Sequence, residues 1–556
     1  MTSRASPLCL TDISMKITLF TINASYVHSS AALRCLTPPL MRAGFEVSAV
    51  ERTLQDRRRD VLYALVSENA DVYGFSAAIW NIRELSEPGT ELKLLTGKPI
   101  ILGGPEMTGA DGETAAKYSF ADCIIDGEGE ITLPRVCRMF EAGVTPPKIL
   151  RGEDASAVFL TAGHGYTESD AAEPKLIGYE SSRGCPYRCR YCVSSLDRRV
   201  FAKPAEQVIA ECDDLERIFA NSDRQRTVKF LDRTFNFDPR RALEIWRRLA
   251  EGDRHLSYHF EVCAELLDDK TLDFLASVPE GRFRFEIGVQ STNPKTLEAV
   301  DRPTDMPKLT ATLADLRRAS GISVHADLIA GLPHEGYERF AESFDKVYSL
   351  CDVIQVGFLK LLPGTPLRRD AENGSFPCVF SPNPPYEVLS TPDLSYEELR
   401  RLHGVSDACE RFGSFGRSGS GGFTRSLGYI TSRIPSPFAL FERLAQQGGE
   451  MRFSQPEAYR LLARVGSEFL DTDMHAEFLS YMRLDWLLSE TAYCPDFLCP
   501  EQITDRSSLR RIFAELEEIA PDIHRHSCEA HRFAFDRGHI HVVDRRNRRF
   551  YALPNE

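Results

Sequence analysis

The sequence predicts an α/β protein of three parts. Short apolar runs alternate with stretches of helical spacing, first over residues 15–143 and again over residues 178–370. The first series predicts a doubly wound, Rossmann-like domain, and the second predicts a partial (β/α)6 barrel of the TIM type. The alternation then stops, and residues 371–556 predict a mostly helical domain. We expect residues 1–14 to be a disordered leader and residues 144–177 to be a linker.

The first series contains five expected strands, each followed by a helical stretch. They are Lys16–Asn23, Phe45–Glu51, Asp71–Ser76, Pro99–Gly103 and Asp122–Asp126. Such alternation predicts a parallel sheet, whose ligands bind beyond the carboxyl ends of its strands. The candidate ligand-binding residues in those loops are His28, Ser76, Gly103, Gly104, Gly127, Glu128 and Gly129. Glycine lets the backbone approach a ligand closely, although tight turns alone also explain these glycines. No G-x-G-x-x-G follows the first strand, which disfavours a nicotinamide or flavin cofactor.

The second series contains six expected strands. They are Gly178–Ser182, Val228–Leu231, Tyr258–Cys263, Arg284–Val289, Ser323–Ile329 and Val353–Phe358. Helical stretches separate them, and the chemistry of such a barrel lies at the carboxyl ends of its strands. Further along the chain, Glu457–Phe469 and Ser507–Ile519 have helical spacing, and residues near 530–552 predict a β-hairpin.

The composition argues against a protein that binds nucleic acid by bulk charge. The chain has 81 acidic and 67 basic residues and a net charge of −14, so we expect no nucleic acid partner. No apolar run reaches the ~18 residues of a membrane span, and the first residues lack the apolar segment of a secretory signal. We therefore expect a cytoplasmic protein. Its 15 cysteines are an odd number on a long chain, which favours reduced thiols over disulfides.

Three cysteines lie together at the end of the first expected barrel strand. Cys185, Cys189 and Cys192 have the spacing C-x3-C-x2-C. Three thiolates on one short loop can ligate three irons of a [4Fe–4S] cluster, which leaves the fourth iron open for catalysis. A structural zinc site is the alternative. Such a site needs four ligands, and only Cys494 and Cys499 are candidates for remote partners.

At these residues the sequence resembles the radical S-adenosylmethionine (SAM) superfamily, with Tyr191 as the aromatic residue before the last cysteine. The resemblance implies that the three cysteines hold a catalytic [4Fe–4S] cluster. It also implies that the free iron binds the amino and carboxylate groups of SAM. Reductive cleavage of SAM then gives a 5′-deoxyadenosyl radical that abstracts hydrogen. Residues 285–291, 327–333 and 361–366 resemble the motifs of the fourth, fifth and sixth barrel strands.

The resemblance also suggests residues that contact SAM. Glu286 and Gln290, in the fourth-strand motif, are expected to face the SAM ribose or nearby solvent. The usual Gly-Gly-Glu after the second strand is missing, and Phe230–Asn236 stands in its place. Asp232 or Asn236 would then bind the SAM amino group. Strand-end capping or an ion pair is the alternative role for the acidic residues.

The N-terminal domain resembles the cobalamin-binding domain of one large radical SAM class, on the residues Gly103-Gly-Pro105 and Gly127-Glu-Gly-Glu130. The Asp-x-His-x-x-Gly motif that supplies a lower cobalt ligand in many cobalamin proteins is absent. Only His28 lies in a suitable loop, so the lower face of cobalt would carry His28, water or no ligand. The region after residue 366 resembles an uncharacterised C-terminal domain of one subfamily.

These motifs predict a cobalamin-dependent radical SAM enzyme that binds a [4Fe–4S] cluster, SAM and cobalamin. The expected reaction is transfer of a methyl group to an unactivated carbon of a small molecule or peptide, with a second SAM remethylating the cobalamin. A flavodoxin or ferredoxin is the expected reductant. The alternatives are a non-methylating enzyme such as a tetrapyrrole-type oxidative cyclase, a radical SAM enzyme without cobalamin, and a non-enzymatic iron–sulfur redox or metal sensor.

Overall fold

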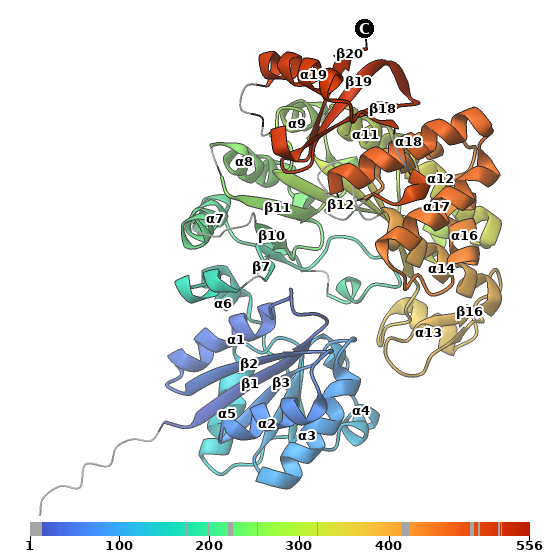
Figure 1. Cartoon of the computed structure of the whole chain (residues 1–556). Helices are drawn as coiled ribbons and strands as arrows, with labels where there is room; N and C mark the ends of the chain where they lie inside the picture. Colours follow the sequence, from blue (N-terminus) through green and yellow to red (C-terminus); the bar gives the residue numbers. More distant parts are fainter. Residues whose placement is uncertain are drawn as a thin grey trace, which may run out of the picture. The chain divides into compact units, whose positions relative to one another are not determined.

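The computed structural model describes residues 14–555, except 174, 198, 221–225, 253, 320, 414–421, 490–493, 499–500, 521–522 and 524. The expected leader therefore lies outside the described residues, apart from Ser14. The chain forms two compact units, whose elements are labelled in Figure 1. The first contains residues 1–261, 360–376 and 380–387, and the second contains residues 262–359, 377–379 and 388–556.

All strands of the N-terminal sheet are parallel, and their order is β2-β1-β3-β4-β5-β6. Their bounds are β1 Lys16–Asn23, β2 Glu46–Thr53, β3 Val72–Ser76, β4 Ile100–Gly103, β5 Cys123–Asp126 and β6 Ile149–Arg151. The chain reverses its direction of travel across the sheet between β1 and β3. A doubly wound sheet binds its ligands at the carboxyl ends of the strands at such a switch point.

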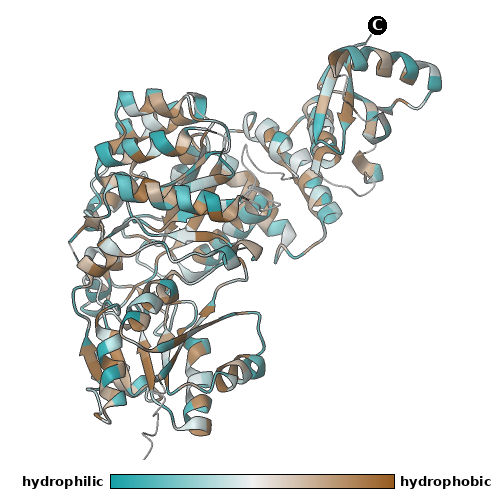
Figure 2. Ribbon diagram, turned by 90° about the vertical axis from the view of Figure 1, so that its left-hand side faces the viewer, coloured by the Kyte–Doolittle hydropathy of each residue, from teal (hydrophilic) through white to brown (hydrophobic). Residues whose placement is uncertain are grey.

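Helices cover both faces of this sheet. Helices α2 (Arg58–Ser67) and α3 (Ile82–Thr96) contribute to one buried apolar core, and α1 (Ala31–Arg42) and α5 (Thr132–Glu141) contribute to the other. Strands buried on both faces are mostly apolar, as the inner strands β3, β4 and β5 are, whereas the edge strand β2 has several polar residues (Figure 2). The predicted doubly wound domain is confirmed.

The five expected strands agree with the structure to within two residues, but a sixth strand was not predicted. Strand β6 lies in the segment expected to be a linker, and it pairs with β5. Three residues are too few to show a periodic pattern, so this strand could not be predicted from the sequence. The segment continues through α6 (Ser156–Thr161) and a 3-10 helix at Glu168–Ala172.

The six strands expected for the barrel are present, three in each unit. In the first unit β10 (Arg226–Phe230) pairs in parallel with β7 (Ile177–Tyr179) and β11 (Leu256–Glu261). In the second unit β13 (Ser323–Ala330) pairs in parallel with β12 (Phe283–Gln290) and β14 (Val353–Phe358). The helices between them are α7 Ala205–Phe219, α8 Pro239–Ala250, α9 Asp269–Leu275, α10 Pro294–Ala299, α11 Met306–Ala319 and α12 Tyr337–Tyr348. This alternation confirms the predicted series of six βα repeats.

The C-terminal region of the second unit is mostly helical, as expected. Its longer helices are α14 Tyr396–Gly413, α15 Thr424–Thr431, α16 Pro437–Gly448, α17 Gln455–Phe469, α18 Thr472–Ser489 and α19 Arg506–Ile519. The expected hairpin belongs to an antiparallel sheet of β17 Glu501–Gln502, β18 Cys528–Phe533, β19 Asp536–Asp544 and β20 Arg549–Pro554. Within the described part of the chain, no helix combines the length and apolar character needed to cross a membrane.

A glycine after β4 has no room for a side chain. Gly104 has a φ of +106°, and a Cβ there would lie 2.4 Å from the carbonyl oxygen of Ala77. We expect Gly104→Ala to lower the free energy of unfolding by about 2–4 kcal/mol through backbone strain and overpacking. Gly112→Ala is the control, because a Cβ at Gly112 meets nothing within 4 Å. Chemical denaturation of the full chain measures the difference, and equal effects of the two variants would contradict the expectation.

Candidate active site

The cysteine loop leaves the barrel through a short antiparallel ribbon. Strand β8 (Ser182–Arg183) pairs with β9 (Phe201–Ala202), so residues 184–200 form a loop that is closed at its base. Gly184 has a φ of +89°, and a Cβ there would lie 1.9 Å from the carbonyl oxygen of Arg199. Only glycine fits this close approach of the two loop ends.

The three cysteines occupy this loop as free thiols. Cys189 is buried, and Cys185 and Cys192 are half-buried, as is Tyr191. Burial raises the pKa of Cys185, and nearby thiolate charge at Cys192 and Cys189 raises it further. Hydrogen bonds from the Thr234 side chain, at 3.6 Å, and from the backbone of Tyr187 act in the opposite direction. The thiols therefore lie close enough to interact electrostatically.

This donor set suits an iron–sulfur cluster, because soft thiolates bind iron and three of them can each ligate a different iron of a cubane. Among the described residues, no group of three or more His, Cys, Asp or Glu side chains is placed to hold a single metal ion. Of the two remote cysteines considered for zinc, Cys494 is half-buried, and Cys499 lies outside the described residues.

The segment that replaces Gly-Gly-Glu packs directly against the start of the cysteine loop. Asp232 is fully buried and accepts hydrogen bonds from the backbone N–H of Ser181 (2.9 Å) and from the hydroxyls of Ser181 and Ser182 (2.6 Å each). Burial raises the pKa of Asp232, whereas these bonds and the charge of Arg241 lower it. Asn236 is also buried, 1% exposed. The structure thus brings Asp232 beside the cysteine loop in a structural role, and its contact with SAM stays a prediction.

The loops after β1 and β3 meet at the switch point of the N-terminal sheet. His28 lies exposed in the first loop, where its carbonyl oxygen accepts a hydrogen bond from the Asn23 side chain (3.1 Å). Ser76 ends β3, and its carbonyl oxygen accepts hydrogen bonds from Thr21 (3.0 Å) and Asn81 (3.3 Å). Both residues therefore lie at the predicted edge, and a contact of either one with a cofactor stays a prediction.

The predicted glycines permit close approach of backbones at this edge. Gly127 has a φ of +116°, and a Cβ at Gly129 would lie 2.9 Å from Leu36 of α1. Gly103 is less constrained, since its nearest neighbour would be Ile125 at 3.8 Å. Close packing therefore explains Gly104 and Gly129, and the positive φ explains Gly127. A cofactor contact at any of the three stays a prediction.

One arginine joins the cysteine loop to the loop after β5. Arg183 Nη1 lies 3.0 Å from Glu128 Oε1, Arg183 Nη2 lies 2.6 Å from Glu130 Oε1, and Arg183 Nε lies 3.0 Å from Glu180 Oε2. Glu128 also accepts a hydrogen bond from the backbone N–H of Ala155 (2.8 Å). Glu128, predicted to bind a cofactor, therefore already has two partners.

A second buried contact ties the loop after β4 to the segment that follows the barrel. The hydroxyl of Tyr386 donates a hydrogen bond to Glu106, one residue after the Gly103-Gly-Pro105 motif. Burial raises the pKa of Glu106, and the bond from Tyr386 opposes the shift. The Arg368 guanidinium stacks over the Tyr386 ring, 5.2 Å from its centroid.

The motif of the fourth barrel strand, which is β12 in the second unit, ends in a residue with a strained backbone. Gln290 has a φ of +69°, and its buried Oε1 has no hydrogen-bond partner among the described residues. Glu286 lies half-buried in the middle of the same strand. Residues held in such backbone conformations cluster at functional sites, which agrees with the expected role of Gln290 near SAM.

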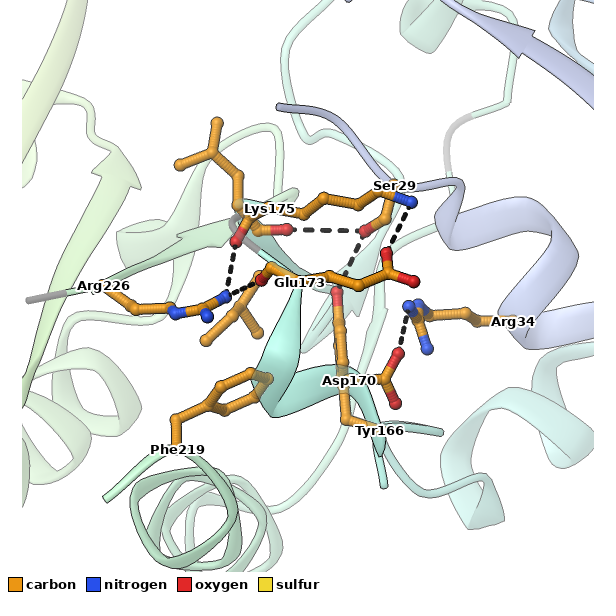
Figure 3. A pocket seen from close by; sticks show the side chains of 10 residues that line it. Ser29, Arg34, Tyr166, Asp170, Glu173, Lys175, Phe219 and Arg226 are labelled. Carbon is orange, nitrogen blue, oxygen red and sulfur yellow. Dashed lines mark hydrogen bonds and ion pairs between the residues drawn. The ribbon is translucent and has the colours of Figure 1, made fainter. Parts of the chain in front are cut away.

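Charged side chains that line a small pocket beside α1 form ion pairs with one another. Figure 3 shows that Arg34 pairs with Asp170 (2.7 Å) and that Lys175 pairs with Glu173 (2.8 Å). The side chain of Arg226 donates to backbone carbonyls, including that of Ala171 at 2.7 Å. These contacts thus hold the segment between the two domains against α1 and the barrel.

Sequence reasoning missed Arg183, Glu106 and Tyr386 as members of this region, and it named Glu130 only as part of the glycine motif. Arg183 directly precedes Gly-Cys-Pro, and Glu130 and Glu106 lie within or next to the quoted glycine motifs. Their position beside motif residues was a usable signal. Tyr386 gave none, because it meets Glu106 from a segment 280 residues away.

Three family models match consecutive parts of the chain. The B12 binding domain matches residues 17–137, the radical SAM superfamily matches residues 179–347, and a protein of unknown function, DUF4080, matches residues 374–542. The chain is therefore a radical SAM protein with an N-terminal B12-binding domain and a C-terminal DUF4080 domain. These matches confirm the predicted family and fold class and, at the level of the domains, the predicted cofactor classes.

Two of the curated relatives are named as methyl-transferring enzymes. The chain is 25% identical over 370 residues to the cobalamin-dependent radical SAM methyltransferase TokK of Streptomyces tokunonensis, over 60% of this chain and 53% of that protein. It is 26% identical over 282 residues to the hopanoid C-2 methylase of Rhodopseudomonas palustris, over 48% of this chain and 51% of that protein. The chain thus spans about half the length of these relatives.

Two solved structures share the fold. The cobalamin-dependent SAM radical enzyme OxsB, with aqua-cobalamin and SAM bound, superposes with a TM-score of 0.57 at 14% identity, over 92% of this chain and 81% of that one. The radical SAM methyltransferase TsrM from Kitasatospora setae, with cobalamin and a [4Fe–4S] cluster bound, gives 0.55 at 18% identity, over 66% and 76%. At these identities the likeness establishes the fold alone.

Each cysteine of the loop is expected to be essential for iron binding. Cys189→Ala should lower iron after anaerobic reconstitution from about four atoms per chain to near zero, because a cubane cluster on three cysteines loses one of its few protein ligands. Cys378→Ser is the control, since burial raises the pKa of that thiol to about 11 and it lies outside the loop. Iron analysis and the cluster absorbance check this. Retained SAM cleavage in Cys189→Ala would refute the assignment.

The contact between Tyr386 and Glu106 is expected to stabilise the first unit. Tyr386→Phe removes a donor to a half-buried carboxylate and should cost about 1–3 kcal/mol. The pKa of Glu106 in the folded chain then rises further, so the loss should grow as pH rises through the folded wild type's pKa for Glu106, which lies above its ordinary value of 4.5. Denaturation at pH 5 and pH 8 measures this. A loss of equal size at both pH values would contradict the expectation, and Glu106→Gln in the same background should remove the pH dependence.

Proposed function

We propose that this protein is a cobalamin-dependent radical SAM methyltransferase that acts on an unactivated carbon. The observation that carries the proposal is the cysteine loop, which lies at the end of the first barrel strand and is tied to the loop after β5 of the B12-binding domain through Arg183. Parallel strands of both sheets direct their carboxyl-end loops to sites of ligand binding and chemistry. The methyltransferase relatives support the reaction class.

Cys185, Cys189 and Cys192 would hold the cluster, and the loops at the carboxyl ends of β1, β3, β4 and β5 would hold cobalamin. When bound, the cluster and SAM supply one-electron cleavage of SAM, and cobalamin supplies the methyl group. The protein supplies binding and orientation. Buried Asp232 fixes the start of the cysteine loop, and Gly184 lets the two ends of the loop close.

The substrate is proposed to be a small molecule or a peptide, and the electron donor a flavodoxin or ferredoxin. The net charge of −14 supports the absence of a nucleic acid partner. The substrate pocket would exclude water while the reacting groups are held within reach of one another.

The decisive experiment measures the metal content first and the products second. Protein purified without oxygen from cells supplied with cobalamin should contain about four iron atoms and one cobalt atom per chain. With a reductant, SAM and a small-molecule extract, it should form 5′-deoxyadenosine and S-adenosylhomocysteine in equal amounts. Deoxyadenosine without S-adenosylhomocysteine would instead establish the non-methylating alternative. Iron without cobalt would establish the cobalamin-free one, and neither metal after reconstitution would refute the proposal.

A further inference from the structure

One guanidinium contacts three carboxylates that come from two different loops. Glu180 lies in the same barrel segment as Arg183, whereas Glu128 and Glu130 lie after β5 in the B12-binding domain. The Arg183 side chain is only 17% exposed, and its guanidinium lies over the Phe159 ring at 4.6 Å from the centroid. A planar guanidinium fork can meet three carboxylates at once, which a lysine ammonium on a flexible stem does less well.

Both ends of this bridge are held firmly. Arg183 is followed by Gly184, whose backbone lies so close to Arg199 that only glycine fits, and Cys185 comes next. On the other side, Glu128 accepts a hydrogen bond from the Ala155 backbone, and a Cβ at Gly152 would lie 2.6 Å from Glu128 N. Arg183 therefore links the cysteine loop to the loop after β5, so that a displacement of one loop would also displace the other.

We propose that Arg183 is a positioning residue that couples the two cofactor sites. Cluster assembly on Cys185, Cys189 and Cys192 strengthens cobalamin binding beside Gly127–Glu130, and cobalamin binding strengthens retention of the cluster. This inference rests on the proposed function, since it takes the cysteine loop as the cluster site and the loop after β5 as part of the cobalamin site.

The physical basis is the guanidinium that the two loops share. A cofactor that shifts the cysteine loop also shifts Arg183, and with it the Glu128 and Glu130 carboxylates beside the second cofactor site. Coupling between binding sites is reciprocal, and typical coupling changes an affinity by about five-fold or more. A merely structural ion pair would instead change the stability of the fold and leave the two binding events independent.

The test compares the dissociation constant of hydroxocobalamin in two forms of the full chain, with the cluster reconstituted and without iron. Anaerobic absorbance titration gives both values. We expect the cluster-loaded wild type to bind cobalamin about five-fold or more tightly than the iron-free form. In Arg183→Gln this ratio should fall to about one. Iron loss to a chelator should be slowed by cobalamin in the wild type and unaffected by it in the variant.

Arg34→Gln is the matched control. Arg34 is 20% exposed, pairs with Asp170 and lies over the Tyr166 ring at 4.0 Å from the centroid, so it resembles Arg183 in burial and contacts (Figure 3). It contacts neither the cysteine loop nor Gly127–Glu130 in the described structure. The coupling ratio should therefore be retained in Arg34→Gln. Loss of the ratio in both variants would show that any weakening of the unit has this effect, and it would overturn the proposal.

Glu130→Gln removes a carboxylate partner of Arg183 and so tests the same coupling. It provides the test if Arg183→Gln does not fold. It removes one charged partner, 6% exposed, and leaves the cysteine loop unchanged. A direct contact of Glu130 with cobalamin would lower affinity in both forms equally and preserve the ratio, whereas coupling predicts a lower ratio. An unchanged ratio in this folded variant would overturn the proposal.

Failure of the coupling differs from failure of the proposed function. A wild type that binds cobalamin equally well with and without iron retains both cofactor sites, and only the coupling is wrong. A wild type that binds no cobalamin in either form refutes the cobalamin part of the proposed function, and the coupling is refuted with it.

Discussion

The buried carboxylate of Asp232 is the contact on which the geometry of the candidate site depends. It lies after β10 and accepts three hydrogen bonds from Ser181 and Ser182, which directly precede the cysteine loop. Arg241 of α8 donates to the carbonyl oxygen and hydroxyl of the same Ser181 (3.1 and 2.9 Å) and adds a positive charge near the carboxylate. A fully buried charge is stable only with such partners. The start of the loop is therefore fixed by the barrel itself.

This constraint bears on the missing Gly-Gly-Glu motif. Recruiting Asp232 for the SAM amino group would require exchange of hydrogen bonds that already satisfy both carboxylate oxygens, and an unsatisfied buried donor costs about 1–3 kcal/mol. The same carboxylate would then have to hold the cysteine loop and bind a ligand. The structural role of Asp232 is thus sufficient to explain an acidic residue at this position. Asn236 is the other residue that we expect to bind the SAM amino group.

The sequence predicted the repeating parts of the fold well because periodicity and strand-end loops are local signals. The strands from β1 to β5 and the six barrel strands follow from apolar runs, and the cysteine spacing located the centre of the site. Strand β6 has three residues and gave no pattern. The partners of Asp232, Arg183 and Glu106 were not predictable, since each pairs with residues distant in the sequence or in another loop. Long-range pairing of charges leaves no periodic trace.

The DUF4080 region is not simply an appended module. Its family model begins at residue 374, yet residues 380–387 belong to the first unit, where Tyr386 donates to Glu106 beside the Gly103-Gly-Pro105 motif. Burial raises the pKa of Glu106, and the Tyr386 bond opposes that shift. A B12-binding domain cut free of residues 380–387 would leave Glu106 without the Tyr386 bond. The start of the DUF4080 region therefore contributes a hydrogen bond beside a motif of the N-terminal domain.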